Sequence, residues 1–143
     1  MSDWLPQARI CAAIFHNGQT DKAGEDYLFH LSRVAGRLSG DDQIVAWLHD
    51  VIEDTEYEMS DIKSYFPDNI ASAVDAITKR NGETYAAYLK RVKSNDMALR
   101  VKLADIADNS DPERLAKLDE KTRVRLKMKY ETALETLLSE ARG

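Results

Sequence analysis

Histidine and carboxylate side chains crowd together in one short segment of the chain, His49-Asp50-Val51-Ile52-Glu53-Asp54-Thr55. On a helix, His49 and Glu53 are four residues apart, as are Asp50 and Asp54, so their head groups can converge. Close carboxylates repel one another unless they take up a proton or bind a cation. Because an imidazole stands beside these acids, the segment favours a metal ion over a shared proton.

A solvated helix end with a buried, hydrogen-bonded His49 would explain the same segment without a metal. Two distant residues bear on the choice, because His30 and Asp105 each stand among apolar neighbours in the chain. A carboxylate in apolar surroundings is costly unless it is paired or coordinates an ion. Lys102, three residues before Asp105, could form a simple ion pair with it, but that pairing would leave His30 unexplained.

The order of these residues resembles a known enzyme pattern. His30, the pair His49-Asp50 and Asp105 resemble the H…HD…D signature of the HD-domain metal-dependent phosphohydrolases. Longer stretches, over roughly residues 8 to 115, resemble successive motifs of the RelA/SpoT hydrolase domain: 16–19, 24–30, 48–55 and 102–109. The chain is most similar to the small stand-alone alarmone hydrolases of that group, which lack the synthesising domain and the regulatory tail.

The resemblance implies an all-helical HD fold that holds one Mn²⁺ ion through His30, His49, Asp50 and Asp105. It also implies removal of pyrophosphate from the ribose 3′ position of ppGpp and pppGpp. Four nitrogen and oxygen ligands leave about two positions of an octahedral ion open, which suits Mn²⁺ and admits water and a phosphate oxygen. Water on such an ion loses its proton more readily and becomes a nucleophile at neutral pH.

Further roles follow from the same resemblance. Glu53 and Asp54 take the catalytic role, in which general acid or base work is worth about 10² to 10⁴ in rate. Which of the two acts as acid and which as base is left open. The residues expected to bind the substrate are Lys22, Tyr27, Lys102 and Asn109.

The sequence departs from the family pattern at three places. Leu31 follows the first histidine where the family usually has proline, and Asp21 stands where many alarmone hydrolases have an arginine that contacts guanine. The tripeptide 106–108, Ile-Ala-Asp, replaces the commoner Arg-Leu-His before Asn109. The expected metal ligands are unaffected, whereas Asp21 would repel phosphates, an effect that Lys22 could partly offset.

Length, composition and charge limit the alternatives. The 143 residues suffice for one domain, residues 1–143, and a hydrophobic content of 43% can form a core. Lys and Arg total 20 against 25 Asp and Glu, and this net charge of −5 disfavours general DNA binding. No apolar run approaches the roughly 20 residues that cross a membrane, and the single cysteine excludes an intrachain disulfide. We therefore expect a cytoplasmic protein.

Alanine and leucine at helical spacing, with few glycines, predict an all-α bundle of about seven helices. A final longer helix fills most of the C-terminal segment 116–143. The helical stretches are expected over residues 3–16, 27–39, 41–53, 60–66, 70–79, 85–92, 98–109 and 118–140.

Three other features are interpreted as mainly structural. His16 at the end of the first helix is expected to cap or pack, and Tyr85 and Tyr88, at helical spacing, are expected to pack. The basic segment 79–102 holds seven Lys and Arg, of which at most two or three are expected to contact a polyphosphate.

Two alternatives to (p)ppGpp hydrolysis stay open at this point. One is an HD phosphohydrolase that acts on another nucleotide or phosphorylated small molecule. The other is a nucleotide-binding HD module without catalysis, in which Glu53 and Asp54 are surface acids. We expect a small-molecule nucleotide partner, no DNA and no membrane, and a homo-oligomer stays open.

Overall fold

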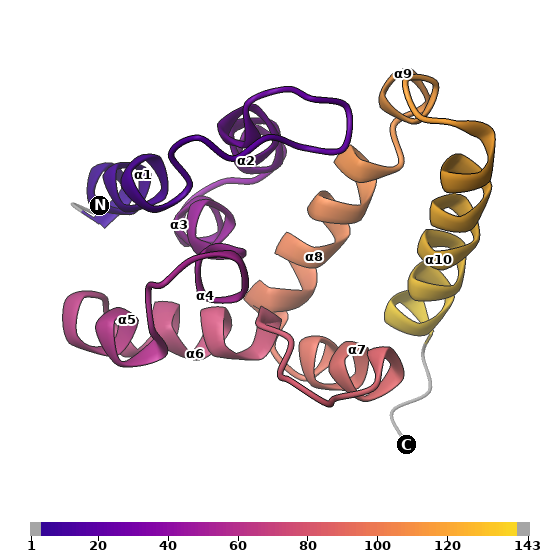
Figure 1. Ribbon diagram of the computed structural model, residues 1–143. Helices are drawn as coiled ribbons and strands as arrows, with labels where there is room; N and C mark the ends of the chain where they lie inside the picture. Colours follow the sequence, from indigo (N-terminus) through magenta and orange to yellow (C-terminus); the bar gives the residue numbers. More distant parts are fainter. Residues whose placement is uncertain (1–3, 140–143) are drawn as a thin grey trace.

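The computed structural model describes residues 4–139, and every regular element in this range is a helix (Figure 1). The predicted all-α class is confirmed, with ten helical segments where about seven were expected. The helices are α1 (Trp4–Phe15), α2 (Tyr27–Gly36), α3 (Asp41–Leu48), α4 (Val51–Asp54), α5 (Met59–Tyr65), α6 (Asp68–Ile77), α7 (Tyr85–Lys93), α8 (Asp96–Asn109), α9 (Pro112–Leu115) and α10 (Glu120–Leu138).

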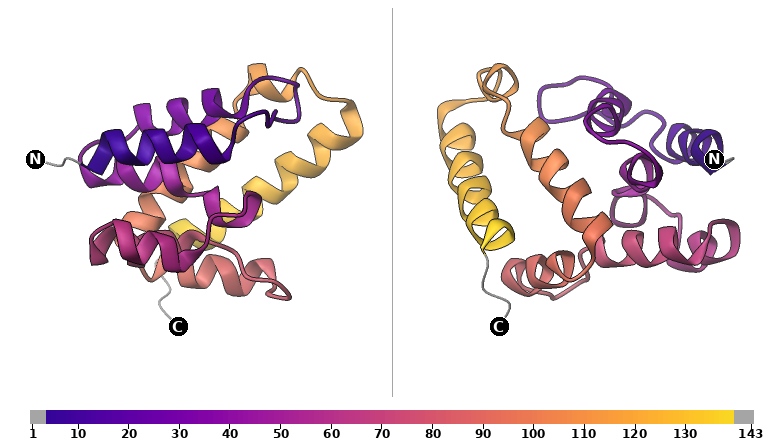
Figure 2. Two further views of the ribbon diagram at one scale, coloured as in Figure 1. Left: turned by 60° about the vertical axis from the view of Figure 1, so that its left-hand side comes forward. Right: turned by 180° about the vertical axis from the view of Figure 1, so that it is seen from behind.

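Helix α8 crosses the middle of the molecule, with α10 set along one side (Figures 1 and 2). It contacts α2, α3, α6, α7 and α10. A helix with neighbours on several sides buries residues around much of its circumference, and α8 buries apolar residues such as Ala98, Val101 and Ile106. Asp105 and Asp108 are buried on the same helix. Helix α8 thus carries two carboxylates into the interior.

Side-chain caps fix where the site-bearing helices begin. Asp26 accepts a hydrogen bond from the backbone N–H of Leu28 at the start of α2, and Asn95 accepts one from Ala98 at the start of α8. Such a cap stabilises a helix by about 1 kcal/mol because it satisfies an amide that has no partner within the helix. The positions of both helices along the chain are thereby set.

The single helix predicted over residues 41–53 is wrong, because the structure divides it into α3 and α4. His49 and Asp50 lie between the two helices, and Asp50 has backbone angles of φ −109° and ψ 0°. On a regular helix, neighbouring side chains point about 100° apart. The interruption lets two consecutive side chains approach one point.

The segment between α1 and α2 folds back on itself in a turn that begins and ends with glycines. Gly18 and Gly24 have φ angles of 84° and 85°, which residues other than glycine rarely adopt. Within the turn, Oδ1 of Asp21 accepts backbone hydrogen bonds from Ala23 and Glu25, at 2.9 and 3.0 Å. The turn therefore holds Asp21 in one place.

The remaining differences from prediction are small. Helix α9 was not expected, and α8 begins at Asp96 instead of residue 98. The expected ends at residues 3 and 140 lie outside the described residues. Cys11 is buried and free, and within residues 4–139 no helix combines the length and apolar character needed to span a membrane.

Candidate metal centre

Helix α2 carries His30 into the interior, where 1% of the residue is exposed. Its Nε2 atom lies 2.9 Å from Oδ1 of Asp105, and its Nδ1 atom lies 2.6 Å from Oδ2 of Asp108. Both partners belong to α8, more than 70 residues further along the chain. The packing of α2 against α8 therefore engages both ring nitrogens of His30.

His49 and Asp50 reach the same place from the break between α3 and α4. The Nδ1 atom of His49 donates to the backbone oxygen of Ala46 at 2.6 Å, which leaves Nε2 directed inward. That Nε2 lies 3.1 Å from Oδ2 of Asp50 and 3.2 Å from Oδ1 of Asp105. The break thus supplies one imidazole and one carboxylate from adjacent residues.

Asp105 is the shared partner at the centre of the group. Its Oδ1 atom faces the Nε2 atoms of His30 and His49 and accepts a hydrogen bond of 3.1 Å from Asn109. Its Oδ2 atom lies 3.1 Å from Nζ of Lys102. The ion pair with Lys102 weighed above is therefore present, but it engages only one of the two carboxylate oxygens.

The structure brings together the four residues predicted as metal ligands, His30, His49, Asp50 and Asp105. One ligand atom from each lies within 4.8 Å of all the others. Two imidazole nitrogens and two carboxylate oxygens form a donor set that divalent first-row ions accept. This donor set, on side chains that are mostly buried, fits a divalent metal ion of the kind typical of HD domains.

Proximity also shifts the protonation of the cluster. Burial acts to lower the pKa of His49, but the charges of Asp50 and Asp105 outweigh burial and raise this pKa well above its usual value. Burial acts to raise the pKa of Asp105, but Lys102 and His49 hold it well below its usual range. Protons and a metal ion compete for the same imidazole nitrogens, so metal affinity falls as the solution becomes acidic.

Three residues expected to bind substrate contact the carboxylates of the cluster. The Tyr27 hydroxyl donates to Oδ2 of Asp50, and Lys102 and Asn109 contact Asp105 as described. All three also line a cavity beside the cluster, as does the fourth expected residue, Lys22. They can therefore orient a carboxylate and face a ligand at the same time.

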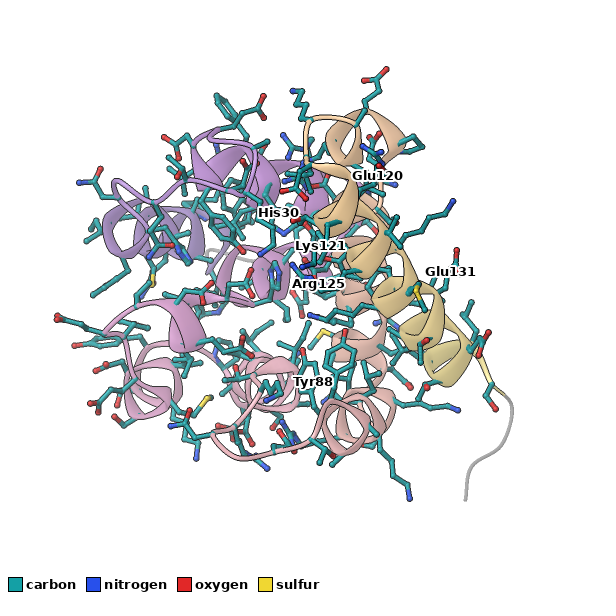
Figure 3. All side chains as sticks on the ribbon, turned by 45° about the vertical axis from the view of Figure 1, so that its right-hand side comes forward. His30, Tyr88, Glu120, Lys121, Arg125 and Glu131 are labelled. Atoms are coloured by element: carbon teal, nitrogen blue, oxygen red, sulfur yellow. The ribbon has the colours of Figure 1, made fainter. Side chains whose placement is uncertain are left out.

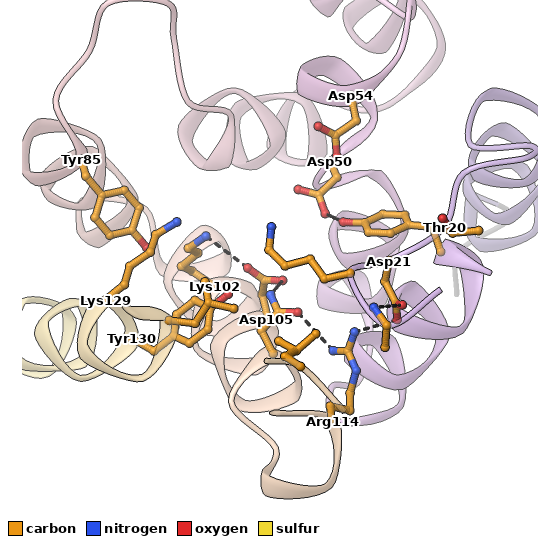
Figure 4. Close-up of a pocket in the computed structure, with 16 residues that line it drawn as sticks. Thr20, Asp21, Asp50, Asp54, Tyr85, Lys102, Asp105, Arg114, Lys129 and Tyr130 are labelled. Carbon is orange, nitrogen blue, oxygen red and sulfur yellow. Dashed lines mark hydrogen bonds and ion pairs between the residues drawn. The ribbon is translucent and has the colours of Figure 1, made fainter. Parts of the chain in front are cut away.

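The cavity has a volume of about 400 Å³. Figure 4 shows Asp50 and Asp54 on one side of it, and Tyr85, Lys129 and Tyr130 on the opposite side. This volume is at the smaller end of the range for small-molecule sites. The cluster therefore opens onto a space that can hold at least part of a nucleotide.

The two predicted catalytic acids lie in different surroundings. Asp54 lines the cavity, and burial together with the charge of Asp50 raises its pKa. Among the described residues, Glu53 is not one of those that line the cavity. Its Oε1 accepts a hydrogen bond from the backbone N–H of Lys79. Burial also raises the pKa of Glu53. The expected convergence of Glu53 with His49 on one continuous helix is not observed, because the helix ends before His49.

The wall of the cavity that α7 and α10 contribute was not predicted from the sequence. Tyr85, expected only to pack, lines the cavity with Lys129 and Tyr130, and Nζ of Lys129 lies 4.9 Å from the centre of the Tyr85 ring. Tyr88 does pack as predicted, since its hydroxyl donates to the backbone oxygen of Ile77 at 2.6 Å. Figure 3 shows Tyr88 and His30 in the interior.

His16 is fully buried at the end of α1, in agreement with a packing role. Its Nδ1 atom lies 2.8 Å from Oε1 of Gln19, and Nε2 of Gln19 donates to the backbone oxygen of Asp54 at 3.0 Å. This chain of contacts joins the end of α1 to the end of α4. It was not predicted from the sequence.

Most of the basic side chains of segment 79–102 do not line the cavity. Arg91 pairs with Glu83, and Arg100 pairs with Asp42, whose side chain is 11% exposed. Among the described residues of this segment, Lys102 is the one basic side chain that lines the cavity.

Asp21, which was expected to repel phosphates, lines the cavity as one member of an ion pair. Its Oδ2 atom accepts a hydrogen bond of 2.9 Å from Nη2 of Arg114. Burial acts to raise the pKa of Asp21, but hydrogen bonds from Glu25 and Arg114 lower it below its usual value. Arg114 also lines the cavity, so a guanidinium offsets part of the charge of Asp21, and the repulsion of phosphates by Asp21 stays a prediction.

Known proteins resemble the chain in sequence and in fold. A guanosine-3′,5′-bis(diphosphate) 3′-pyrophosphohydrolase of Vibrio cholerae is 36% identical over 80 residues, which are 52% of this chain and 11% of that protein. The bifunctional (p)ppGpp synthase/hydrolase SpoT of Escherichia coli is 29% identical over 121 residues, which are 73% of this chain and 17% of that protein. The chain thus spans less than a fifth of either relative.

A solved structure has the same fold with a TM-score of 0.77. It is described as a metazoan ortholog of SpoT that hydrolyses ppGpp, and it is 20% identical, with 96% of this chain and 86% of that chain covered. These similarities confirm the resemblance to SpoT and RelA hydrolase domains. The model of the HD domain matches residues 8–109, a range that contains all four residues of the cluster. The chain therefore belongs to the HD domain family.

Proposed function

We propose that this chain is a metal-dependent phosphohydrolase that removes pyrophosphate from the 3′ position of (p)ppGpp. The observation that carries the proposal is the cluster of His30, His49, Asp50 and Asp105 at the edge of a cavity. Cationic side chains line the same cavity and can balance the charge of a polyphosphate: Lys22, Lys102 and Lys129. The named activity of the relatives supports the choice of substrate.

We infer that the four residues of the cluster hold Mn²⁺. A mixed set of nitrogen and oxygen donors suits this ion, and related divalent ions are alternatives that metal analysis distinguishes. When bound, such a cation supplies Lewis acidity, which stabilises charge on phosphoryl oxygens and makes water a stronger acid. Tyr27, Lys102 and Asn109 hold the carboxylates of Asp50 and Asp105 in place around it.

Glu53 and Asp54 are the proposed groups for proton transfer. Hydrolysis adds water across the bond between the ribose 3′ oxygen and phosphorus, so one proton must leave the water and one must reach that oxygen. Burial raises the pKa of both acids, which brings them closer to the range in which a group can both accept and donate a proton. Asp54 lines the cavity and is the nearer of the two to a bound substrate.

Substrate contacts are proposed for Lys22, Tyr27, Lys102 and Asn109. Lys22 lies in the turn between α1 and α2, where its charge can meet a phosphate. The other three face the cavity beside the cluster, so they can contact the group that is cleaved.

The direct test is to incubate the purified protein with ppGpp and Mn²⁺. We expect GDP and pyrophosphate in equal amounts, and no products from an Asp105→Asn variant whose fold is verified by circular dichroism. Absence of turnover in a wild-type protein that retains bound metal would reject ppGpp as the substrate.

One observation, the pairing of Asp21 with Arg114, favours a second substrate class: another nucleotide or a phosphorylated small molecule. Asp21 stands where the resemblance to alarmone hydrolases implies an arginine that contacts guanine, so this pair alters the expected base-binding side of the cavity. A panel of nucleotides and other phosphate esters, assayed in parallel with ppGpp, ranks the two classes. Binding of a nucleotide without hydrolysis of any panel member would instead favour a non-catalytic module.

A further inference from the structure

Asp108 is a buried carboxylate that the proposed reaction does not use. It lies one helical turn after Asp105 on α8, and 1% of the residue is exposed. A buried carboxylate requires compensating partners. Its partners connect it to the cluster.

The carboxylate of Asp108 has three cationic or hydrogen-bonding partners. Its Oδ2 atom lies 2.6 Å from Nδ1 of His30, the nitrogen that points away from the cluster. Arg33 donates from Nε to Oδ1 at 2.7 Å and from Nη2 to Oδ2 at 3.3 Å. Arg114 donates from Nη1 to Oδ2 at 2.8 Å. Side chains from α2 and α9 thus meet at one residue of α8.

Two guanidinium groups donate to this carboxylate, and a carboxylate held in this way acts as the acceptor toward its other neighbours. The Nδ1 atom of His30 must therefore carry the proton that lies between the two groups. The proton fixes the ring by its Nδ1 edge, so that Nε2 faces Asp105.

His49 provides an independent parallel within the same cluster. Its Nδ1 atom donates to the backbone oxygen of Ala46 at 2.6 Å, and its Nε2 atom faces Asp105 at 3.2 Å. Both imidazoles are thus held through Nδ1 and directed inward through Nε2. A backbone carbonyl performs this task for His49 and a side-chain carboxylate for His30.

We propose that Asp108 is a positioning residue of the cluster, which directs Nε2 of His30 inward and is itself held by Arg33 and Arg114. The inference rests on the proposed metal binding and adds a residue outside the four ligands. A partner of this kind, placed behind a metal-binding histidine, orients the ring and makes its free nitrogen more basic.

The test compares Asp108 with a matched carboxylate that makes no described contact with the cluster. Asp42 is also buried and pairs with an arginine, since Nε of Arg100 donates to its Oδ2 at 2.6 Å. Affinity for Mn²⁺ alone is measured by titration calorimetry for Asp108→Ala, Asp108→Asn, Asp42→Ala and Asp42→Asn. We expect about 100-fold weaker binding for Asp108→Ala, about tenfold for Asp108→Asn, and wild-type binding for both Asp42 variants.

A second measurement does not depend on metal. In protein labelled with ¹⁵N at histidine, the Nδ1 proton of His30 is expected as a downfield resonance that Asp108→Ala removes and Asp42→Ala retains. If Asp108→Ala fails to fold, Arg33→Met is compared with Arg100→Met, and only the former is expected to weaken Mn²⁺ binding, by several-fold.

The outcomes separate this inference from the proposed function. Equal Mn²⁺ affinity of folded Asp108→Ala and Asp42→Ala would overturn the positioning role and leave the hydrolase proposal intact. A wild-type protein that binds no Mn²⁺ but shows the His30 resonance, lost only in Asp108→Ala, would reject the proposed metal and still support the orientation of His30 by Asp108.

Discussion

The cavity has two walls that differ in construction. One wall carries the cluster of His30, His49, Asp50 and Asp105. His30 and His49 are 1% and 2% exposed, and the Nδ1 atom of each ring has a hydrogen-bond partner outside the cluster. The opposite wall comes from α7 and α10, where Tyr85 and Tyr130 are only partly buried and Lys129 is exposed. Fixed side chains suit a bound ion and its chemistry, whereas a more exposed wall can adapt to the shape of a ligand.

The largest effect is expected from damage to the fixed wall. His49→Ala removes one of the four proposed ligands, so bound metal and hydrolysis should both be lost. The loss of metal affinity should exceed the roughly 100-fold that is typical when a residue behind a ligand is removed. Metal content after purification, measured by mass spectrometry, checks this expectation. His16→Ala, which removes an equally buried histidine outside the cluster, is the control and should retain metal.

The second expectation concerns Glu53 and Asp54, which are proposed to transfer protons but not to bind the metal. Replacement of both by Gln and Asn should lower kcat by about 10² to 10⁴ and leave Mn²⁺ affinity nearly unchanged. Steady-state kinetics and calorimetry on the same preparation provide both values. If turnover is unaffected, the proposed catalytic pair is incorrect.

The third expectation concerns stability of the fixed wall in acid. Burial acts to raise the pKa of Asp108, but hydrogen bonds from His30 and Arg33 lower it from 3.8 to about 2. Because the folded pKa is depressed, the stabilisation is fully present above the unfolded value and is lost as pH falls from about 4 to 2. It amounts to about 2 kcal/mol.

Urea unfolding of the wild type and Asp108→Asn, measured from pH 6 to pH 2, tests this sign. The free energy of unfolding of the wild type should exceed that of Asp108→Asn by a constant amount near pH 6, and this difference should shrink toward pH 2. A difference that instead grows in acid would contradict the depressed pKa.

The smallest effect is expected on the exposed wall. Lys129→Met should raise KM by about tenfold and change kcat little, because a charged hydrogen bond to a bound phosphate contributes about 1.5 kcal/mol. Lys127→Met is a suitable control, since Lys127 is on the same helix but is not among the described residues that line the cavity. A large fall in kcat for Lys129→Met would show that the exposed wall also takes part in the chemical step, and the contrast between the two walls would fail.

The sequence was informative about the fixed wall for a physical reason. His49 and Asp50 are adjacent, and the types of His30 and Asp105 stand out because apolar neighbours surround them in the chain. Helical periodicity likewise predicted most helices. It did not predict the break at residues 49–50, since the amino acids there do not exclude a helix and tertiary contacts of the cluster favour the interruption.

The partners contributed by distant segments could not be predicted. Asp108 and His30 are 78 residues apart, and Arg114 and Asp21 are 93 apart. Each charged residue taken alone is compatible with an exposed position, and only the packing of α2, α8 and α9 selects the pairs. Lys129 and Tyr130 share a side of α10 with buried Leu126, and this spacing was the one available signal for the second wall.

The position of α10 along the chain has an evolutionary consequence. The match to the HD domain ends at residue 109, and α10 begins at Glu120. Selection can therefore change Lys129 and Tyr130 without altering a residue of the matched segment, provided that Leu126, Ala133 and Leu137 still anchor the helix. Tyr85 of α7 lies within the matched segment, so this wall of the cavity combines residues from inside and outside it.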